Sequence, residues 1–448
     1  MAMKLGLIWF GNDLRSTDQK MLWRAAQEVD QLVCLYCNEP HTKRPSRYAT
    51  QGISTIRRDF LLEGLDDLAM HLESLEQTLF VSQHNAATSI TLLLNALPIS
   101  HIYRNHHGGW DEQQTLRQVA HDFPDVHFHI DHGLTLFEPW QLPFQVTELP
   151  TSFSTFRRLV ENVDIASPMP IVRELPPAPN LNLPLIRSWQ IEPIQGFHTF
   201  VGGEEAAQQQ LNDYFATDLP SYYKDVRNAL DGWENSTKLS PWLAQGSLSA
   251  KQIKACLDVY ERDHGANEST YWISFELLWR EYFHWYATCY GKKLFLPGGL
   301  SNKQTQTTFY AERFRKWCQG NTPYPIVNAC MKQLNQTGFM SNRGRQIVAS
   351  CLIYELGIDW RYGAAYFEEQ LIDYDVGSNW GNWQYIAGVG ADPRGGRHFN
   401  LEKQTEQYDP NQHFVQKWRG HEFDKQLDSV DAADWPISPA YHSHKEQP

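Results

Sequence analysis

The stretch LIDYDVGSNWGNWQY, residues 371–385, gathers side chains that seldom share a surface loop. Asp373 and Asp375 stand two positions apart, and three aromatic residues, Trp380, Trp383 and Tyr385, follow close behind. Neighbouring carboxylates repel one another unless a cation or a hydrogen-bond donor relieves them. Indoles gain from burial or from stacking on a flat partner. The stretch therefore predicts a binding site.

Two arginines in TGFMSNRGRQ offer partners for these carboxylates. Arg343 and Arg345 follow a glycine-containing turn and precede an apolar run that predicts a helix. Cations are disfavoured at a helix start, whereas anions are stabilised there. An ion pair between Arg345 and Asp373 would relieve the repulsion and leave Asp375 to accept a hydrogen bond from a ligand.

A third group lies in STYWISFELLWREYFHW, residues 269–285, which predicts a helix. Helical spacing places four side chains on one face: Trp272, Glu276, Trp279 and Phe283. A packed core stripe is the alternative, but a charged group inside such a stripe is costly unless it is paired or solvated. We therefore expect Glu276 in a cavity wall, with Arg280 pairing with it or binding an anion.

The segment NSTKLSPWLAQGSLS, residues 235–249, places hydroxyl groups before a proline-started helix. Hydroxyls and backbone N–H groups at a helix start can bind phosphate. Taken alone, the segment more often indicates an ordinary N-cap, with Ser240 as the cap and Pro241 as the first helical residue.

The order of elements predicts the fold class, α/β followed by all-α. Up to residue 135, the β-rich runs KLGLIWF, QLVCLYC, TLFVSQ, HIYRN and VHFHID alternate with helical stretches, which predicts a parallel α/β sheet. No G-x-G-x-x-G follows the first run. Residues 136–205 are rich in proline and predict a long linker, residues 206–423 predict a helical domain, and residues 424–448 form a polar tail.

Charge and targeting signals narrow the class of protein. The formal net charge of −13 argues against broad, charge-driven binding to nucleic acid or membrane, although it is compatible with a local basic groove. No signal-peptide pattern and no apolar run of transmembrane length is present, so we expect a cytoplasmic protein.

Cysteine and histidine patterns predict no metal site. The seven cysteines are scattered, and the C-x-x-C of Cys34 and Cys37 lies in a predicted strand, so we expect reduced core thiols. HFHIDH, with His127, His129 and His132, is compatible with a metal cluster or with solvated histidines, and the second is favoured because no matching acidic or histidine motif accompanies it.

Several of these segments together resemble the photolyase/cryptochrome family, most closely its cryptochrome-DASH branch, over nearly the whole chain. The resemblance rests on LIWFGNDLRSTD, STKLSPWLAQGSLS, FELLWREYF, YPIV, TGFMSNRGRQ and DYDVGSNWGNWQYIAGVGADPR. It implies an N-terminal α/β antenna-type domain and a C-terminal helical domain that binds FAD non-covalently. The cofactor contacts that it implies by position are Tyr223, Ser236, Thr237, Lys238, Leu239, Ser240, Glu276, Arg280, Asn342, Arg345, Asp373, Asp375 and Asn379.

The resemblance also implies a light-driven reaction in which excited reduced FAD gives an electron to a cyclobutane pyrimidine dimer. The residues implied at the reacting centre are Glu276, Trp279, Asn342 and Asn379, and those implied at DNA are Arg343, Gln346, Tyr385, Arg394 and Arg397. Gln346 and Tyr385 replace more apolar groups of duplex photolyases, so less binding free energy is available to offset the cost of flipping a base out of a duplex. We therefore expect UV-damaged single-stranded DNA as the partner, with neither a membrane nor an obligatory protein partner.

This sequence departs from the family pattern at three places. Trp383 and Trp360 match the inner two tryptophans of the family's electron chain, but Thr307 occupies the outermost position and interrupts the ordinary chain. Tyr310, Trp317 and Trp380 are candidate substitutes, among which the sequence does not choose. Trp380 itself stands where a tyrosine is usual. His107 stands where a folate-binding carboxylate is expected, which leaves the binding of a 5,10-methenyltetrahydrofolate antenna open.

Two other functions remain open at this point. A blue-light photoreceptor with little repair would share the flavin site but would not need the dimer-facing residues Glu276, Trp279 and Asn342. A flavin or nucleotide oxidoreductase ranks last, because the sequence lacks a nicotinamide fingerprint and a clear acid/base pair.

Overall fold

The computed structural model describes residues 3–37, 48–82, 84–181, 183, 186–190, 199–305, 307–391 and 395–424. The chain divides into two compact units. Unit 1 contains Met1–Asp225, Ser236–Gly291 and Ile372–Ser378, and unit 2 contains Val226–Asn235, Lys292–Leu371 and Asn379–Pro448. The domain boundaries expected from the sequence stay a prediction, and nearly all of the expected polar tail lies outside the described residues.

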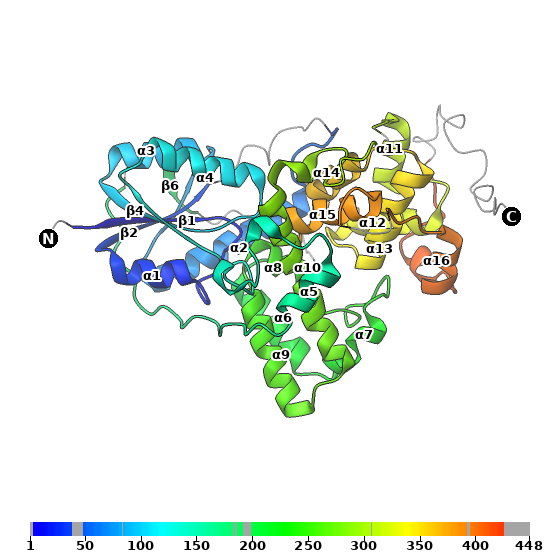
Figure 1. Ribbon diagram of the computed structural model, residues 1–448, viewed down its shortest axis with the longest axis horizontal. Helices are drawn as coiled ribbons and strands as arrows, with labels where there is room; N and C mark the ends of the chain where they lie inside the picture. The colour runs from blue at the N-terminus through cyan, green and yellow to red at the C-terminus, as the bar shows by residue number, and fades with distance from the viewer. Residues whose placement is uncertain are drawn as a thin grey trace. The chain divides into compact units, whose positions relative to one another are not determined.

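A six-stranded sheet organises the described part of unit 1 (Figure 1). Its strands are β1 Leu5–Phe10, β2 Gln31–Cys37, β3 Leu79–Ser82, β4 Ile99–Asn105, β5 His127–Asp131 and β6 Ile186–Ser188. Their order is β5-β4-β1-β2-β3-β6, and the pairing is parallel except where β6 runs antiparallel to β3. The five expected strands are confirmed. β6 was not expected, because three residues in a proline-rich interval show no periodicity.

Helices cover both faces of this sheet. α1 Lys20–Glu28 and α2 Thr55–Ser74 pack on one face, and α3 Ala86–Ala96 and α4 Trp110–Asp122 pack on the other (Figure 1). Each face has its own apolar core, as expected for strands that are buried on both sides. Cys34 and Cys37 are buried in β2, which confirms the prediction of core thiols.

Over its described residues, unit 1 also contains the helices α5 Phe153–Val160, α6 Glu204–Phe215, α8 Ser240–Gln245, α9 Ala250–His264 and α10 Glu268–Tyr290, and all but the last residue of α7 Tyr223–Val226. α10 confirms the helix expected over 269–285, and Asn267 caps it by accepting from the N–H groups of Ser269 and Thr270. The interval 136–205 contains α5 and β6 as well as 3₁₀ turns at Pro139–Gln141 and Val146–Glu148. Its role as a linker stays a prediction.

Unit 2 is helical over its described residues. Its helices are α11 Ala311–Gln319, α12 Pro325–Thr337, α13 Asn342–Ser350, α14 Trp360–Gln370, α16 Leu401–Tyr408 and α17 His413–Lys417, with most of α15 Val376–Ala387 and a π-helical turn at Cys351–Glu355. The helix expected over the apolar run IVASCLIYEL begins earlier, at Asn342, where the hydroxyl of Ser341 accepts from Gly344 N–H, so Arg343 and Arg345 lie within its first turn.

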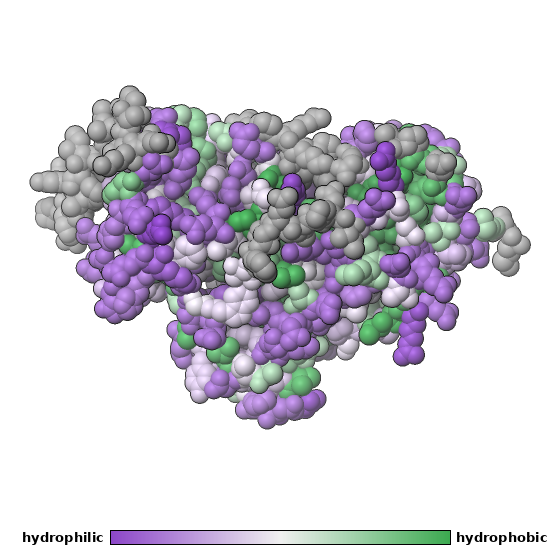
Figure 2. Space-filling model, turned by 180° about the vertical axis from the view of Figure 1, so that it is seen from behind, coloured by the Kyte–Doolittle hydropathy of each residue, from purple (hydrophilic) through white to green (hydrophobic). Residues whose placement is uncertain are grey.

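The surface is mostly polar on the face that Figure 2 shows, where hydrophobic residues are scattered among hydrophilic ones. Within the described residues, no helix is both long enough and apolar enough to cross a bilayer.

A buried carboxylate connects the loop after β1 to two helices of unit 1. Glu204, at the start of α6, accepts from the backbone N–H groups of Ser16 (2.7 Å) and Thr17 (3.0 Å). On α2, the Nδ1 atom of His71 lies 3.4 Å from the Glu204 carboxylate and 3.5 Å from that of Asp67. Hydrogen bonding to Glu204 and the charge of Asp67 outweigh burial, so the pKa of His71 is raised.

The raised pKa of His71 gives a pH-dependent contribution to stability. Because the folded protein binds this proton more tightly than the unfolded chain, the contribution is full below the ordinary histidine pKa and is lost as pH rises through the folded value. We expect His71→Gln to lower Tm by a few degrees at about pH 6 and by less at about pH 8. In the matched control, His121→Gln at the exposed His121–Asp122 pair, Tm should change little. Equal losses at both pH values would contradict the assignment.

Candidate functional site

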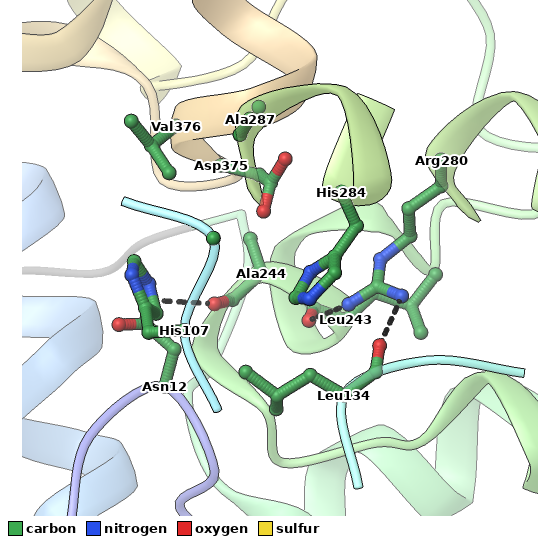
Figure 3. A pocket seen from close by; sticks show the side chains of 12 residues that line it. Asn12, His107, Leu134, Leu243, Ala244, Arg280, His284, Ala287, Asp375 and Val376 are labelled. Atoms are coloured by element: carbon green, nitrogen blue, oxygen red, sulfur yellow. Dashed lines mark hydrogen bonds between the residues drawn. The ribbon is translucent and has the colours of Figure 1, made fainter. Parts of the chain in front are cut away.

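A pocket in unit 1 lies where the loops after β1, β4 and β5 meet α8, α10 and the segment before α15 (Figure 3). It is lined by Asn12, His107, Gly108, Leu134, Leu243, Ala244, Arg280, His284, Ala287, Asp375, Val376 and Gly377. Parallel α/β sheets typically bind ligands outside the carboxyl ends of their strands. The structure therefore brings Arg280 and Asp375, two residues expected at a cofactor, to one pocket.

Arg280 is held by backbone carbonyl groups from two other segments. Its Nη1 donates to Leu134 O at 2.7 Å and its Nη2 to Leu243 O at 3.4 Å, so that α10, α8 and the segment after β5 are connected (Figure 3). Asp375 precedes α15, and its Oδ1 accepts from Ser378 N–H at 2.7 Å. These contacts fix a guanidinium and a carboxylate in the same pocket wall.

The segment 236–240 folds into a compact polar turn before α8. Lys238 adopts a left-handed backbone (φ 56°), and its Nζ donates to the hydroxyl of Ser236 at 2.9 Å. The hydroxyl of Thr237 accepts from Leu239 N–H at 3.4 Å. Hydroxyl and ammonium groups are thereby gathered in one turn, as a phosphate site requires.

Ser240 corrects one expectation from the sequence. It is the first helical residue of α8 rather than its N-cap, and Leu239 occupies the cap position. Because proline is accepted within the first turn, the helix begins before Pro241 and the Ser240 hydroxyl needs no role as a cap. The hydroxyl instead donates to Asp373 Oδ2 at 2.7 Å, which connects α8 to the aspartate pair.

The helix α10 places Glu276 and Trp279 one turn apart, both partly exposed. The ring of Trp279 stacks on Phe153 of α5, with ring centroids 3.7 Å apart and an interplanar angle of 11°. Tyr223, another expected cofactor contact, lies in an apolar cluster with Tyr214, Leu257 and Ile273.

Glu281 is a buried acid that the sequence reading missed. Its carboxylate accepts from Leu136 N–H at 2.8 Å, Phe137 N–H at 3.3 Å and Trp285 Nε1 at 2.7 Å. Burial is the largest influence and raises the pKa of Glu281 to about 7 despite these donors. The sequence feature that could have revealed Glu281 is its place directly after Arg280 in the predicted helix. Adjacent residues of a helix point to different sides, so Glu281 had to face another part of the chain than Arg280 does.

Three histidines also converge in unit 1 without having been predicted to do so. Burial lowers the pKa of His106 to about 3 and that of His132 to about 4, and it holds the pKa of His284 well below the ordinary value. His132 had been expected to be solvated, but it is only partly exposed, and its ring stacks on Trp285 with centroids 5.3 Å apart.

His107 lines the pocket at the place where a folate-binding carboxylate was expected. Burial disfavours its protonation, but the carboxylate of Glu112, 3.6 Å from Nδ1, outweighs burial and the pKa of His107 is raised. The structure therefore places an imidazole at this position and a carboxylate, Glu112, beside it on α4. Folate binding stays open.

Four tryptophans in unit 2 are buried in two contacting pairs. Trp360 meets Trp380 with ring centroids 5.8 Å apart, and Trp383 meets Trp317 with centroids 6.3 Å apart. A Cβ atom on Gly363 would lie 2.2 Å from Trp383, so Trp383 packs closely against α14 one turn from Trp360. The structure thus gathers both expected electron carriers and two of the three candidate substitutes.

The other expected residues of unit 2 have contacts of their own. Asn379 is buried and donates to Ala364 O at 2.9 Å, and Arg345 Nε donates to Met340 O at 2.9 Å. The ion pair of Arg345 with Asp373 stays a prediction. Asn342 and Gln346 lie in α13.

Two of the expected DNA contacts meet in unit 2. The Nη2 of Arg397 donates to the hydroxyl of Tyr385 at 2.5 Å. Arg343 donates to Asn228 Oδ1 at 3.3 Å and lies over the ring of Tyr408 at 4.6 Å. Arg394 lies outside the described residues.

Two family models match this chain. The model described as DNA photolyase matches residues 6–179, and the model described as FAD binding domain of DNA photolyase matches residues 272–429. A solved structure of a Synechocystis sp. cryptochrome superposes with a TM-score of 0.88 at 36% identity and covers 97% of this chain and 96% of that one. A bacterial class III photolyase from Agrobacterium tumefaciens, at 24% identity and a TM-score of 0.81, shares the fold. The fold and site define a flavoprotein of the photolyase/cryptochrome class.

Among similar proteins, the cryptochrome DASH of Idiomarina loihiensis is 50% identical over 97% of both chains. That of Vibrio parahaemolyticus is 48% identical over 98% of both. This chain belongs to the cryptochrome-DASH branch of the photolyase/cryptochrome family, and FAD is its cofactor. The resemblance, the fold class and the cofactor expected from the sequence are confirmed.

The residues of unit 1 fit this cofactor chemically. FAD contains a pyrophosphate, and the turn before α8 together with Arg280 supplies hydroxyl, ammonium and guanidinium donors for such an anion. Arg280 contacts α8 directly through Leu243 O, so both donor groups belong to one connected framework. The individual contacts stay predictions.

We expect Arg280→Gln to weaken FAD binding by about 10–100-fold, because a charge-assisted hydrogen bond contributes about 1.5–3 kcal/mol. The measurement is FAD affinity of the reconstituted protein by fluorescence quenching. Arg262→Gln, at an exposed arginine of α9 that lies outside the pocket, is the control. If the FAD affinity of the variant is unchanged and its Tm is lower, Arg280 serves only to connect Leu134 and Leu243 and does not bind FAD.

Proposed function

We propose that this protein is a light-dependent photolyase-type enzyme that splits cyclobutane pyrimidine dimers, preferentially in single-stranded DNA. One observation supports this best: Trp279 stacks on Phe153 at 3.7 Å while Glu276 lies one turn earlier on α10. A partly exposed indole with a fixed orientation and a neighbouring carboxyl group together suit a flipped-out base.

Phe153 holds the indole in place. Phe275 and Tyr282 contact Phe153 edge-on, with centroids 5.1 Å and 6.0 Å away, so the ring that supports Trp279 is itself packed. Stacking of a base on an aromatic side chain is worth about 1–3 kcal/mol. Glu276 in its protonated form would donate a hydrogen bond to a carbonyl oxygen of the damaged base, and Asn342 is a second proposed contact of the dimer.

Bound and reduced FAD supplies the light-excitable electron donor. The proposed task of the chain is to orient and shield it. Asp373, fixed by the Ser240 hydroxyl, would pair with Arg345, and Asp375 and Asn379 would contact the ring system. The segment Ser236–Ser240, Tyr223 and Arg280 would bind the phosphate and sugar groups.

The arginines support the preference for single strands. Arg343 is half-buried over Tyr408, and burial lowers its pKa, so its guanidinium is not simply presented to solvent. Arg397 donates a hydrogen bond to the hydroxyl of Tyr385. We propose that Arg397 and Tyr385 contact the DNA strand together with Gln346. With a net charge of −13, few phosphate contacts remain to offset the cost of flipping a base from a duplex.

The deciding measurement is dimer repair by chemically reduced protein under blue light. Oligonucleotides with one thymine dimer, single-stranded and duplex, are illuminated and restored thymines are counted. We expect repair of the single strand and little repair of the duplex. No repair in either would reject the enzyme and favour a photoreceptor.

Replacement of the stacking indole should weaken dimer binding. We expect Trp279→Leu to weaken binding of the dimer-containing single strand by about 5–150-fold, because the aromatic face is lost. Trp272→Leu, on the same helix and also partly exposed, is the matched control, because Trp272 packs against Phe275 at 4.3 Å. Equal losses in the two variants would remove Trp279 from the proposed site.

For the electron chain, we propose Trp380 as the member beyond Trp360 in place of Thr307. Trp380 contacts Trp360 at 5.8 Å, and its Nε1 donates to Glu368 Oε2 at 3.1 Å. An electron passing from Trp380 to oxidised Trp360 leaves an acidic indole cation, whose proton would move to Glu368. By contrast, the Nε1 atoms of Trp360 and Trp317 donate to backbone carbonyl groups.

Photoreduction of the oxidised protein with a thiol reductant tests this route. We expect Trp380→Phe to abolish most of the light-driven loss of flavin absorbance, as Trp360→Phe should, because phenylalanine does not carry the hole. Trp317→Phe should retain photoreduction. The reverse pattern would place the exit at Trp317, which contacts Trp383.

A further inference from the structure

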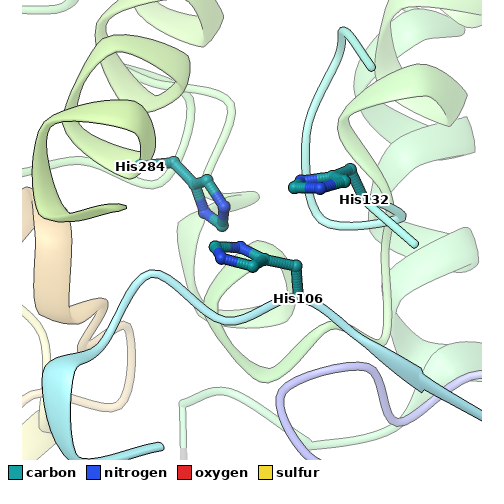
Figure 4. Close-up of side chains that lie close together, drawn as sticks. All are labelled: His106, His132 and His284. Carbon is teal, nitrogen blue, oxygen red and sulfur yellow. The ribbon is translucent and has the colours of Figure 1, made fainter. Parts of the chain in front are cut away.

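Three histidine side chains converge inside unit 1 from three separate elements (Figure 4). His106 follows β4, His132 follows β5 and His284 lies in α10. Each offers a ring nitrogen, and these nitrogens all lie within 4.8 Å of one another. The ring centroid of His106 lies 4.7 Å from that of His132 and 5.8 Å from that of His284.

Each of these rings has a buried nitrogen without a hydrogen-bond partner. The atoms are Nδ1 of His106, Nδ1 of His132 and Nε2 of His284. Leaving one buried polar atom unsatisfied costs about 1–3 kcal/mol, so three converging rings that each have such an atom call for a common partner. Neither stacking nor apolar packing supplies one.

We propose that His106, His132 and His284 together bind one divalent transition-metal ion of the zinc class. Imidazole nitrogens are preferred ligands of such ions, at about 2.0–2.1 Å for zinc. Side-chain rotation has to draw the nitrogens closer than their present separation. Three protein ligands leave a further coordination position for water or a small ligand.

A buried acid lies beside the histidines, and the positive charges of Arg104, Arg117, Lys20 and Arg280 act on them as well. Trp285 stacks on His132 and restricts its ring, and Asp131, the preceding residue, is a buried acid whose Oδ1 bonds Lys20 and whose Oδ2 has no partner. Such neighbouring groups orient ligands and offset charge. Arg280, one turn before His284, directs its guanidinium to the carbonyl groups of Leu134 and Leu243.

A second histidine group on the same two strands provides a matched control. His101 lies 5.2 Å from His127 and 5.3 Å from His129 between ring centroids. His127 is exposed, however, and Nδ1 of His101 is hydrogen-bonded to the hydroxyl of Ser100. Of this second group, only His129 has a buried nitrogen without a hydrogen-bond partner, so the group lacks the feature that all three rings of the first group share.

The test uses the full chain with its FAD, freed of metal by a chelator and titrated with Zn²⁺ against a chromophoric competitor and with Co²⁺ by visible absorption. We expect one equivalent to bind. His106→Asn, His132→Asn and His284→Asn should each weaken binding at least about 100-fold, because loss of a ligand exceeds the loss of an outer-shell contact. The double variant His127→Asn/His129→Asn should bind like the unaltered protein.

Cysteine variants separate ligation from packing. His106→Cys keeps a ligand atom and should retain Co²⁺ with an added sulfur-to-metal absorption band. Circular dichroism identifies any asparagine variant that fails to fold, and the cysteine variant of the same histidine then decides for that position. The proposal is overturned if the unaltered protein retains neither ion, or if the asparagine variants bind as tightly as it does.

Discussion

The buried guanidinium of Arg15 holds together the parts of unit 1 from which the pocket is built. Arg15 has no exposed surface, and it donates to Gly246 O at 2.9 Å, Gly133 O at 2.9 Å and Asp18 O at 3.0 Å. A buried cation is tolerated only when carbonyl or carboxylate oxygens replace its water. The requirement fixes the loop after β1, the loop after β5 and the end of α8 relative to one another. A Cβ on Gly246 would lie 1.9 Å from Asn12 O, so this approach also depends on glycine.

The helix α10 distributes different chemistry over adjacent stripes. Glu276, Arg280 and His284 recur every four residues, and the last two line the pocket. Glu281 and Trp285 lie on the next stripe and hold the segment after β5, through hydrogen bonds to Leu136 and Phe137 and through the stack on His132. One helix thus positions pocket groups with one stripe and holds the segment after β5 with the next.

How much the sequence could predict follows from the range of each interaction. The β-rich runs, the helix over 269–285 and the buried pair Cys34/Cys37 depend on local periodicity, and they were predicted correctly. Ser240 was misassigned as a cap because its actual partner, Asp373, is distant in sequence. The histidine cluster was not predicted, because its members are also distant from one another in sequence. His106, His132 and His284 come from three elements whose meeting point depends on the sheet order, which periodicity does not reveal.

In the expected electron chain, Thr307 in place of a tryptophan changes which neighbouring groups have to stabilise an oxidised tryptophan. In the proposed chain, with Thr307 in the outer position, a route through tryptophans alone is buried, because Trp317, Trp360, Trp380 and Trp383 are all at most 3% exposed. A buried indole cation without water is costly unless it loses its proton. A nearby carboxylate then matters more than access to solvent. Of the two tryptophans that contact the inner pair, Trp380 has this carboxylate, Glu368, at its N–H group, whereas Trp317 donates to the carbonyl of Val348.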